Sequence, residues 1–460
     1  MSLFIFFFTF GIYLHTLTPS VGLDDSGELT TCAYLLSIAH APGYPLYLLL
    51  GKIFTFFPFG EVAFRLNLAS ATFGALSCTL VFLIVLFITQ HRLSSLISSF
   101  CLGFSQTFWI LSTRAEVYTL NTFLVSLLIL IFLNWTQKRN INWLYLFFFI
   151  YGLSLGNHLT IGLFLPIFLY FILKKQITFL KISKSILSFL IGLSIYLYIP
   201  IRSSGDIIVV NWSKVTTLSH FLNYVSGGHF KNLLFSISFF GVIKQLWNYF
   251  LLLITQFPAF VFGIGIIGLI KSFRISKNFS FLISLMWLSL VIFCINYTIV
   301  DIWSFYLPTY LFFSLFIGFG ISFLIKITLP HHRIWVITTI IISLFFSYQL
   351  IYGWLGYKFN KNNYFFPVDF SSQILTQLPN QSLIITNWGY ATCFWYCQKV
   401  YHLRNDIKVL SCKNGNNFKE IVKKYPTYYP VYHIYPKQDY FLTSRGEIFK
   451  ICKKEIRNAK

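Results

Sequence analysis

Residues 24–45 read DDSGELTTCAYLLSIAHAPGYP, and we interpret this stretch as the feature around which the rest of the chain is arranged. Three carboxylates, those of Asp24, Asp25 and Glu28, fall within five residues of a chain that has only 13 acidic residues among 460. The block HAPGYP begins at His40. Its prolines and glycine interrupt an apolar run, so residues 18–65 are predicted to form a loop with short interfacial helices and not one straight membrane span.

The composition is typical of a protein with many transmembrane helices. Hydrophobic residues make up 56% of the chain and charged residues 10%, whereas soluble proteins carry about 25% charged residues. The mean hydropathy is +0.70. A membrane span needs about 20 apolar residues, and such runs recur up to residue 351. We predict about 11 transmembrane helices, at residues 3–18, 66–90, 94–112, 120–136, 142–156, 159–173, 185–200, 247–270, 279–297, 305–325 and 334–351.

The charges between these helices predict the orientation of the chain. One set of loops holds twelve basic residues and no acidic one: Arg92, Lys138, Arg139, Lys174, Lys175, Lys181, Lys184, Lys271, Arg274, Lys277, Lys326 and Arg333. The opposite loops hold Asp24, Asp25, Glu28, Glu61, Glu116, Asp206 and Asp301. Basic residues concentrate on the cytoplasmic side, so the N-terminus is predicted to be cytoplasmic and the acidic loops extracytoplasmic. The net charge of +22 therefore does not indicate a nucleic-acid partner.

Two domains are expected. Residues 1–351 form the transmembrane domain, whose first helix is retained because no cleavage site follows it. Its two large outer loops are residues 18–65 and 201–246. Residues 352–460 are richer in charge and predict a small extracytoplasmic α/β domain. Within it Ser382–Thr386 and Ile407–Ser411 are predicted strands, and Tyr390–His402 is a predicted helix between them.

Four cysteines fall in this second domain: Cys393, Cys397, Cys412 and Cys452. In an oxidising compartment they would form two disulfides, in one of three pairings. A metal site is less favoured, because no further His or Cys cluster completes it.

The acidic cluster is the candidate catalytic group. Clustered carboxylates raise one another's pKa, which suits a general base that takes a proton from a hydroxyl. A divalent cation site and a merely solvated loop are the alternatives. The remaining candidates lie at outer ends of other predicted spans and suit phosphate or sugar binding: His40, Arg65, Arg114, Glu116, His158 and Arg202. Anchoring roles are the alternative for the arginines, and a structural role for His40.

Polar side chains thus gather at one membrane face from several loops. A transporter would more often place ionisable residues near the bilayer midplane. The pattern favours an enzyme that acts on a lipid-borne substrate, with a non-catalytic transporter or flippase of a lipid-linked glycan as the alternative.

Several blocks together resemble the transmembrane protein 260-like family (glycosyltransferase family 117). They are YLHTLTPSVGLDDSGEL (13–29), HAPGYPLYLLLGKIF (40–54), FPFGEVAFRLNLASATFGAL (57–76), FSQTFWILSTRAEVYTLN (104–121), DIWSFYLP (301–308) and TNWGYATCFWYCQKVYHLRNDIKVL (386–410). The resemblance covers nearly the whole chain and implies a GT-C-type fold. By position it assigns the base to Asp25 and a supporting role to Glu28. Asp24 departs from the family pattern and receives no catalytic role.

The resemblance implies an inverting, protein O-mannosyltransferase-like enzyme. Its donor would be a polyprenyl-phosphate sugar, expected to be mannose, and its acceptor a Ser or Thr hydroxyl of a protein; an envelope glycan or lipid acceptor is the alternative. No metal cofactor is expected, because arginines can balance the phosphate charge. The expected location is a bacterial inner membrane, or the endoplasmic reticulum membrane in a eukaryote, with the active site extracytoplasmic.

Overall fold

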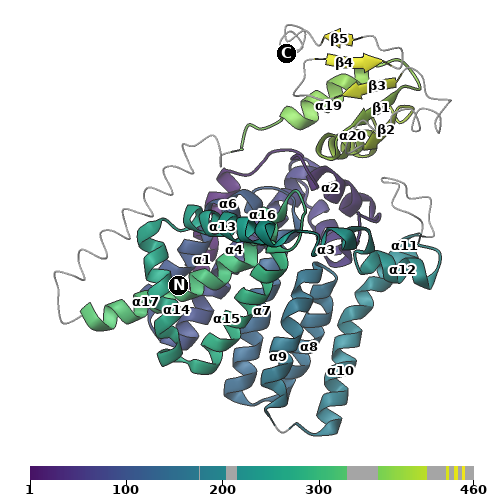
Figure 1. Cartoon of the computed structure of the whole chain (residues 1–460). Coiled ribbons are helices and arrows are strands. Elements are labelled where there is room, and N and C mark those ends of the chain that lie inside the picture. The colour runs from purple at the N-terminus through teal and green to yellow at the C-terminus, as the bar shows by residue number, and fades with distance from the viewer. Residues whose placement is uncertain are drawn as a thin grey trace.

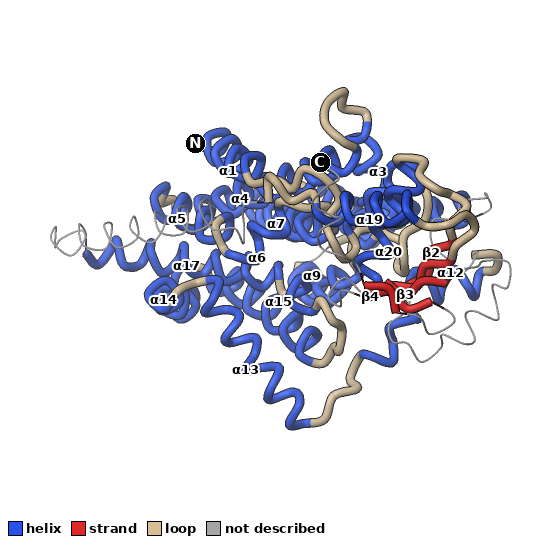
Figure 2. Tube along the Cα trace, turned by 90° about the horizontal axis from the view of Figure 1, so that it is seen from above, coloured by secondary structure: helices blue, strands red, loops and turns tan. Residues whose placement is uncertain are grey.

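The computed structural model describes residues 1–175, 177–203, 215–328 and 361–411, together with three strands, Val431–Ile434, Tyr440–Thr443 and Ile448–Lys450. Within these ranges a large bundle of helices carries a smaller α/β part at one end (Figure 1). Viewed from above, the strands lie towards one side of the bundle, and α14 (Ala259–Ile275) and α17 (Leu307–Thr328) lie towards the other (Figure 2).

The described helices include five stretches that are long and apolar enough to cross a membrane. They are Val62–Thr89 (α4), Val117–Lys138 (α7), Phe179–Ser203 (α10 with the short η2 and α11), Lys277–Ile295 (α15) and Ile302–Ile327 (α16 and α17). Two bent pairs raise the number to seven if each pair is one span: Arg92–Gly103 (α5) with Gln106–Ser112 (α6), and Phe239–Gln256 (α13) with α14. The shorter apolar helices in the described part of the chain are Ser2–His15 (α1), Pro45–Thr55 (α3), Ile141–Leu155 (α8) and Leu159–Leu173 (η1 and α9).

The prediction of a multi-pass membrane protein is therefore confirmed, but the predicted number of about 11 spans is not. Residues 334–351, the last predicted span, lie outside the described residues. The prediction of one continuous span at 247–270 is wrong, because α13 and α14 meet at an angle of 109°. Pro258 stands at this break, and a residue that precedes proline is disfavoured in the helical conformation.

Glycines bring pairs of helices into backbone contact. A Cβ added to Gly192 of α10 would lie 2.1 Å from the carbonyl oxygen of Phe149 in α8. A Cβ on Gly268 of α14 would lie 1.7 Å from the carbonyl oxygen of Phe316 in α17. Small residues at helix contacts are how membrane helices pack closely without a hydrophobic driving force between them.

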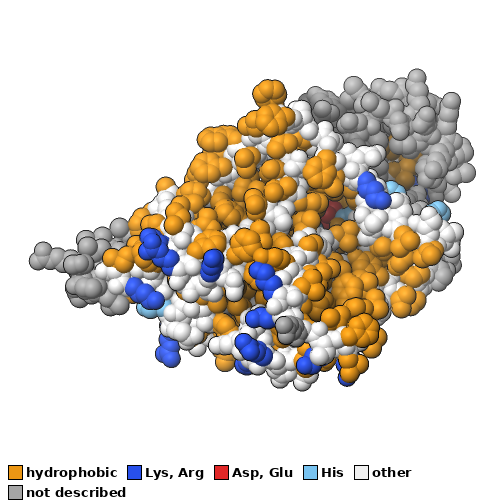
Figure 3. All heavy atoms as spheres, turned by 60° about the horizontal axis from the view of Figure 1, so that its bottom comes forward, with side chains coloured by type: hydrophobic (Ala, Val, Ile, Leu, Met, Phe, Trp, Pro, Cys, Tyr) orange, Lys and Arg blue, Asp and Glu red, His pale blue; other side chains and the backbone are white. Residues whose placement is uncertain are grey.

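Basic side chains gather at the end of the bundle away from the strands. Figure 3 brings that end forward and shows Lys and Arg side chains spread around it, while an acidic side chain is visible only in a recess among hydrophobic ones. This agrees with the separation of charge in the sequence; which side of the membrane this end faces stays a prediction.

The first loop, residues 18–65, holds two short helices as predicted: Ser26–Leu35 (α2) and Pro45–Thr55 (α3). Leu36 ends α2 in a left-handed conformation, φ 52°. Pro45 begins α3, a position that needs no backbone N–H donor. The turn between them, which contains His40, is thereby held against α2.

The C-terminal part contains Phe366–Gln377 (α19), Leu383–Thr386 (β1), Trp388–Val400 (α20) and Lys408–Ser411 (β2). The described strands form a sheet in the order β2-β1-β3-β4-β5, in which β1 pairs in parallel with both β2 and β3. The predicted strand, helix and strand at 382–411 are confirmed. Their extracytoplasmic location stays a prediction, and Asp206, Cys412 and Cys452 lie outside the described residues. Cys393 and Cys397 are free and buried.

Helix α20 packs directly on α2 (Figure 1). The hydroxyl of Thr392 donates to the carbonyl oxygen of Asp24 at 2.8 Å, and the thiol of Cys393 lies 3.4 Å from the carbonyl oxygen of Gly22. A Cβ added to Gly27 would lie 2.5 Å from the backbone of Thr392. The acidic loop and the C-terminal part therefore meet backbone to backbone.

The Gly27→Ala variant tests this contact. Because its methyl group overlaps the α20 backbone, we expect a loss of about 1–3 kcal/mol in the free energy of unfolding. The measurement is thermal unfolding in detergent, with limited proteolysis as a second readout. Gly11→Ala is the matched control, since no atom lies within 4 Å of its added Cβ. Equal stability of the two variants would contradict the close packing of α2 on α20.

Candidate active site

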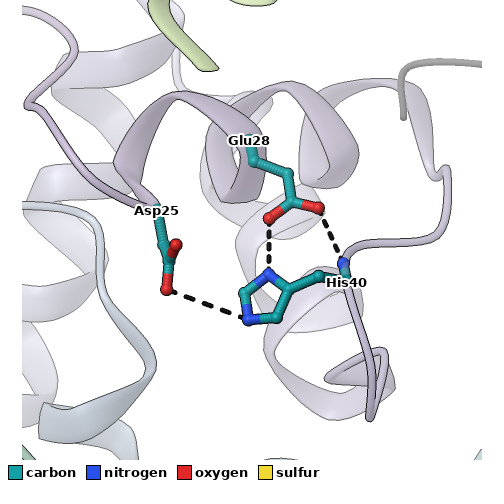
Figure 4. A group of neighbouring side chains, drawn as sticks. All are labelled: Asp25, Glu28 and His40. Carbon is teal, nitrogen blue, oxygen red and sulfur yellow. Dashed lines mark hydrogen bonds and ion pairs between the residues drawn. The ribbon is translucent and has the colours of Figure 1, made fainter. Parts of the chain in front are cut away.

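Asp25, Glu28 and His40 form one cluster (Figure 4). Asp25 is the residue before α2, and Glu28 lies in the first turn of that helix. Glu28 accepts two hydrogen bonds from His40, from its backbone N–H at 2.7 Å and from ring Nδ1 at 2.6 Å. The second ring nitrogen, Nε2, lies 3.8 Å from Oδ2 of Asp25. The imidazole thus stands between two carboxylates.

Burial and charge act together on this cluster. Burial lowers the pKa of His40, but Glu28 and Asp25 outweigh that effect and raise the pKa to about 9. The ring is therefore a cation at neutral pH. Burial also raises the pKa of Asp25, with Glu28 adding to the rise and His40 opposing it. The side chain of Asp25 keeps 22% of its surface exposed, whereas Glu28 is fully buried, so Asp25 is the carboxylate that a substrate can reach.

Aromatic side chains enclose the cluster. The hydroxyl of Tyr44 lies 3.0 Å from Nε2 of His40. The indole N–H of Trp388 donates to Oδ1 of Asp25 at 2.5 Å, and its ring meets the His40 ring edge to face with centroids 5.8 Å apart. Trp388 belongs to α20, so the C-terminal part contributes directly to the wall of the site.

The same three residues could hold a divalent cation. Asp25, Glu28 and His40 each offer one ligand atom, and these atoms lie within 4.8 Å of one another. Carboxylate and imidazole are ordinary ligands of transition metals. Both oxygens of Glu28, however, already accept hydrogen bonds from His40, so a cation bound by all three would have to displace these bonds.

Arg114 and Glu116 lie beside the cluster. The guanidinium of Arg114 is 3.4 Å from a carboxylate oxygen of Asp24 and 3.4 Å from one of Glu116. It also lies 5.6 Å from the ring of Trp303. Its Nε is buried without a hydrogen-bond partner among the described residues. Burial lowers the pKa of Arg114, but Glu116, Asp24 and Asp25 more than offset this and raise it.

A pocket of about 180 Å³ opens next to Arg114. Its lining residues are Thr18, Gly22, Leu23, Asp24, Ile110, Thr113, Arg114, Lys361 and Tyr364. Burial of its ammonium group lowers the pKa of Lys361, and the positive charge of Arg114 lowers it further. Two basic residues, Arg114 and Lys361, thus line one small pocket beside the first loop.

His158 lies on the bundle side of the site. It is 5% exposed, and its Nδ1 accepts from the backbone N–H of Thr160 at 3.4 Å. Burial, with His40 adding to it, lowers the pKa of His158 to about 4, so this ring is neutral at neutral pH. Its ring packs against those of Tyr118 and Phe305.

The hydroxyl of Tyr118 donates to Oδ2 of Asp301 at 2.8 Å. Burial raises the pKa of Asp301, and Asp25 adds to the rise. Asp301 thus faces the cluster from the segment that precedes α16.

The other two predicted arginines are engaged elsewhere. Arg65 donates to the carbonyl oxygens of Thr55, Phe59 and Gly60, and so fixes the turn between α3 and α4. Arg202 donates to the carbonyl oxygens of Leu35 and Leu36 at the end of α2. Their donors are largely occupied by backbone, and a role for them in phosphate binding stays a prediction.

Sequence reasoning did not single out Trp388 as a site residue, whereas Tyr44 and Tyr118 belong to blocks that the family resemblance associates with sugar or phosphate binding. Trp388 lies in the aromatic-rich block at 386–410, which resembles the family pattern. It is 363 residues from Asp25 along the chain, so nothing in the sequence indicated that the two lie together. Tyr44 lies within the HAPGYP block, and Tyr118 follows Glu116 by two residues.

Comparisons with known proteins bear on this region and on the whole fold. Residues 25–181 match the family described as the protein O-mannosyl-transferase TMEM260 N-terminal domain. The protein O-mannosyl-transferase TMEM260 of Mus musculus is 35% identical over 223 residues, which cover 46% of this chain and 32% of the mouse protein. The corresponding protein of Dictyostelium discoideum is 26% identical over 462 residues, covering 87% of this chain and 55% of its own length. The chain thus spans about half the length of these relatives or less.

Solved structures of ArnT from Cupriavidus metallidurans share the fold. The structure bound to undecaprenyl phosphate aligns with a TM-score of 0.58 at 11% identity, over 94% of this chain and 88% of ArnT. The apo structure aligns with a TM-score of 0.54 at 12% identity, over 92% and 87%. At this identity the likeness concerns the fold alone, and it agrees with the predicted GT-C-type architecture. The resemblance predicted from the sequence is confirmed: residues 25–181 match the N-terminal domain of the TMEM260 family, and the fold is similar to that of ArnT.

Proposed function

We propose that this protein is a membrane glycosyltransferase that moves a sugar, mannose in our proposal, from a polyprenyl-phosphate donor to a Ser or Thr hydroxyl of an extracytoplasmic protein. The observation that carries the proposal is the cluster of Asp25, Glu28 and His40 on a loop at the end of an apolar helix bundle. Only Asp25 of the two carboxylates is reachable. The names of the relatives and the undecaprenyl phosphate bound to ArnT support the donor and acceptor classes.

The chemistry follows from the charges. Asp25 takes the proton of the acceptor hydroxyl. The acceptor oxygen then forms a bond to the anomeric carbon while the bond from that carbon to the phosphate oxygen breaks, and its electron pair leaves with the lipid phosphate. One such displacement inverts the anomeric centre. Burial raises the pKa of Asp25, which makes its carboxylate a stronger base.

His40 and Glu28 support the base. Glu28 holds the His40 ring by two hydrogen bonds, and the ring presents Nε2 to Asp25. The imidazolium keeps Asp25 ionised before transfer. Its charge also favours a developing negative charge nearby.

Arg114 is our candidate for the cation that stabilises the departing phosphate. It is the predicted arginine that lies beside the cluster, and its Nε has no hydrogen-bond partner among the described residues. Arginine recognises phosphate in a bidentate manner. In this proposal the sugar hydroxyls are contacted by His158 and by the hydrogen-bonded pair of Tyr118 and Asp301, whose Tyr118 ring packs on that of His158.

The experiment is a transfer assay with the purified protein in liposomes. It uses polyprenyl-phosphate [³H]mannose and a Ser/Thr-containing peptide. Label on the peptide is the expected result. Transfer to a lipid or glycan acceptor but not to peptide would reassign the acceptor. Movement of the donor across the liposome membrane without any transfer would overturn the enzymatic proposal in favour of a flippase.

We expect EDTA to leave the transfer rate unchanged. Both Glu28 oxygens are occupied by His40, and Arg114 supplies positive charge without a metal. The measurement compares the initial rate before and after dialysis against EDTA, with Mg²⁺, Mn²⁺ and Zn²⁺ added back separately. A loss that one of these ions restores would instead assign a cation to the cluster of Asp25, Glu28 and His40.

A further inference from the structure

We propose that Trp388 of the C-terminal part is a positioning residue for Asp25, and that it leaves Oδ2 of Asp25 as the oxygen that receives the acceptor proton. This inference rests on the proposed function. It assigns a role in the reaction to a part of the chain outside the region that matches the TMEM260 N-terminal domain.

The first observation is that the two oxygens of Asp25 are not equivalent. Oδ1 accepts the indole N–H of Trp388 at 2.5 Å. Oδ2 lies 3.8 Å from Nε2 of His40, and among the described residues it accepts no hydrogen bond. A hydrogen bond to Oδ1 restricts rotation of the carboxylate, so Oδ2, which lies beside the His40 ring, keeps a defined direction. A base held in this way needs no reorientation before proton transfer.

Trp388 is itself held at a defined point. It begins α20, and the preceding Asn387 caps the helix by accepting the backbone N–H of Tyr390 at 3.2 Å. Caps of this kind stabilise the first helical turn. The ring of Trp388 also packs edge to face against His40 and against Trp395, with centroids 5.8 and 5.6 Å apart. The indole therefore contacts both the base and the imidazole beside it.

Helix α20 is fastened to both ends of the first loop. Near Asp25, Thr392 donates to the carbonyl oxygen of Asp24. At the far end, the hydroxyl of Tyr396 accepts from the backbone N–H of Ala63 at 3.3 Å. Just beyond α20, Tyr401 donates to Glu61 at 2.6 Å. Because α20 is hydrogen-bonded at these points, its position determines where Trp388 lies, and the hydrogen bond from Trp388 in turn orients Asp25.

The test compares Trp388→Phe with Trp395→Phe. Phenylalanine keeps an aromatic ring but removes the indole N–H together with the five-membered ring, and the same loss of ring occurs in Trp395→Phe. Trp395 is the matched control, because it lies on the same helix and its indole N–H donates to the carbonyl oxygen of Val409, away from the loop. We expect Trp388→Phe to lower kcat by roughly tenfold to a hundredfold, the rate equivalent of one hydrogen bond to a charged group. The donor KM and the melting temperature should match those of Trp395→Phe.

A double-mutant cycle separates positioning from a general structural role. In the Asp25→Asn background, Trp388→Phe should cause little further loss, since the base it positions is already absent. A full additional loss in that background, or parallel falls in melting temperature and kcat, would overturn the inference, as would an unchanged kcat. A wild-type protein without transferase activity would overturn the proposed function and this inference together, whereas an active wild type with an unaffected Trp388→Phe would overturn the inference alone.

Discussion

Asp25→Asn is expected to lower the rate of sugar transfer by roughly 10²–10⁴-fold, the usual contribution of a general base. Asparagine has nearly the same shape, and its side-chain oxygen can still accept the indole N–H of Trp388. It cannot take a proton from the acceptor. The folded structure should therefore survive while the chemical step is lost.

The measurement is kcat in the liposome transfer assay, with the melting temperature recorded for each variant. Asp24→Asn is the matched control, because Asp24 is the adjacent carboxylate and is 60% exposed. Its ion pair with Arg114 is 3.4 Å long and partly solvated, so its loss should change kcat by only about two- to threefold. A fully active Asp25→Asn would reject Asp25 as the base, and equal losses in the two variants would reject the distinction between them.

The second large effect is expected for Arg114→Gln, which should lower kcat by roughly 10²–10³-fold, the range seen when one stabilising donor is removed from a developing anion. The guanidinium lies beside Asp24 and Glu116. Glutamine keeps a polar side chain but neither the charge nor the bidentate geometry. The departing phosphate would then lack the guanidinium that stabilises it in our mechanism.

The interpretation of Arg114→Gln needs a control for folding, because Glu116 is only 3% exposed and would lose its ion-pair partner. A buried charge without a partner is strongly destabilising. The double variant Arg114→Gln/Glu116→Gln removes both charges and should recover thermal stability without recovering kcat. Recovery of kcat in the double variant would show that Arg114 serves only to neutralise Glu116.

Arg65→Gln adds a comparison among the predicted arginines. Arg65 donates to three backbone carbonyls, so we expect this variant to affect stability more than turnover. A fall in kcat as large as that of Arg114→Gln, at unchanged melting temperature, would bring Arg65 into the phosphate site.

The grouping of Asp25, Glu28 and His40 could be predicted because it depends on local structure. Asp25 and Glu28 are three residues apart at the start of a short helix, a spacing that places side chains on the same face. The prolines and glycine after His40 turn the chain back towards that helix. Three close carboxylates were expected, but the structure separates exposed Asp24 from buried Glu28, which the sequence indicated only through the family pattern.

Other features depend on contacts that no local pattern contains. Trp388 reaches Asp25 because α20 packs on α2, and this packing depends on Gly27 rather than on any periodicity. Arg65 and Arg114 have the same side chain in similar settings, and only tertiary structure shows which one faces backbone carbonyls and which one faces carboxylates. The continuous span expected at 247–270 is interrupted at Pro258. A mean hydropathy taken over such a window does not detect a break in the helix.

The distance along the chain between Asp25 and Trp388 also bears on biosynthesis. The two residues are 363 positions apart, and translation at about 5–20 residues per second separates their emergence by roughly 20–70 seconds. During that interval the nascent chain holds the acidic loop without the helix that covers it. The hydrogen bonds that link α20 to Asp24 and Ala63, at the two ends of the loop, form only after α20 has been synthesised. A ribosome-bound precursor therefore presents the carboxylates before it presents a completed site, and the synthesis of α20 determines when the site can be completed.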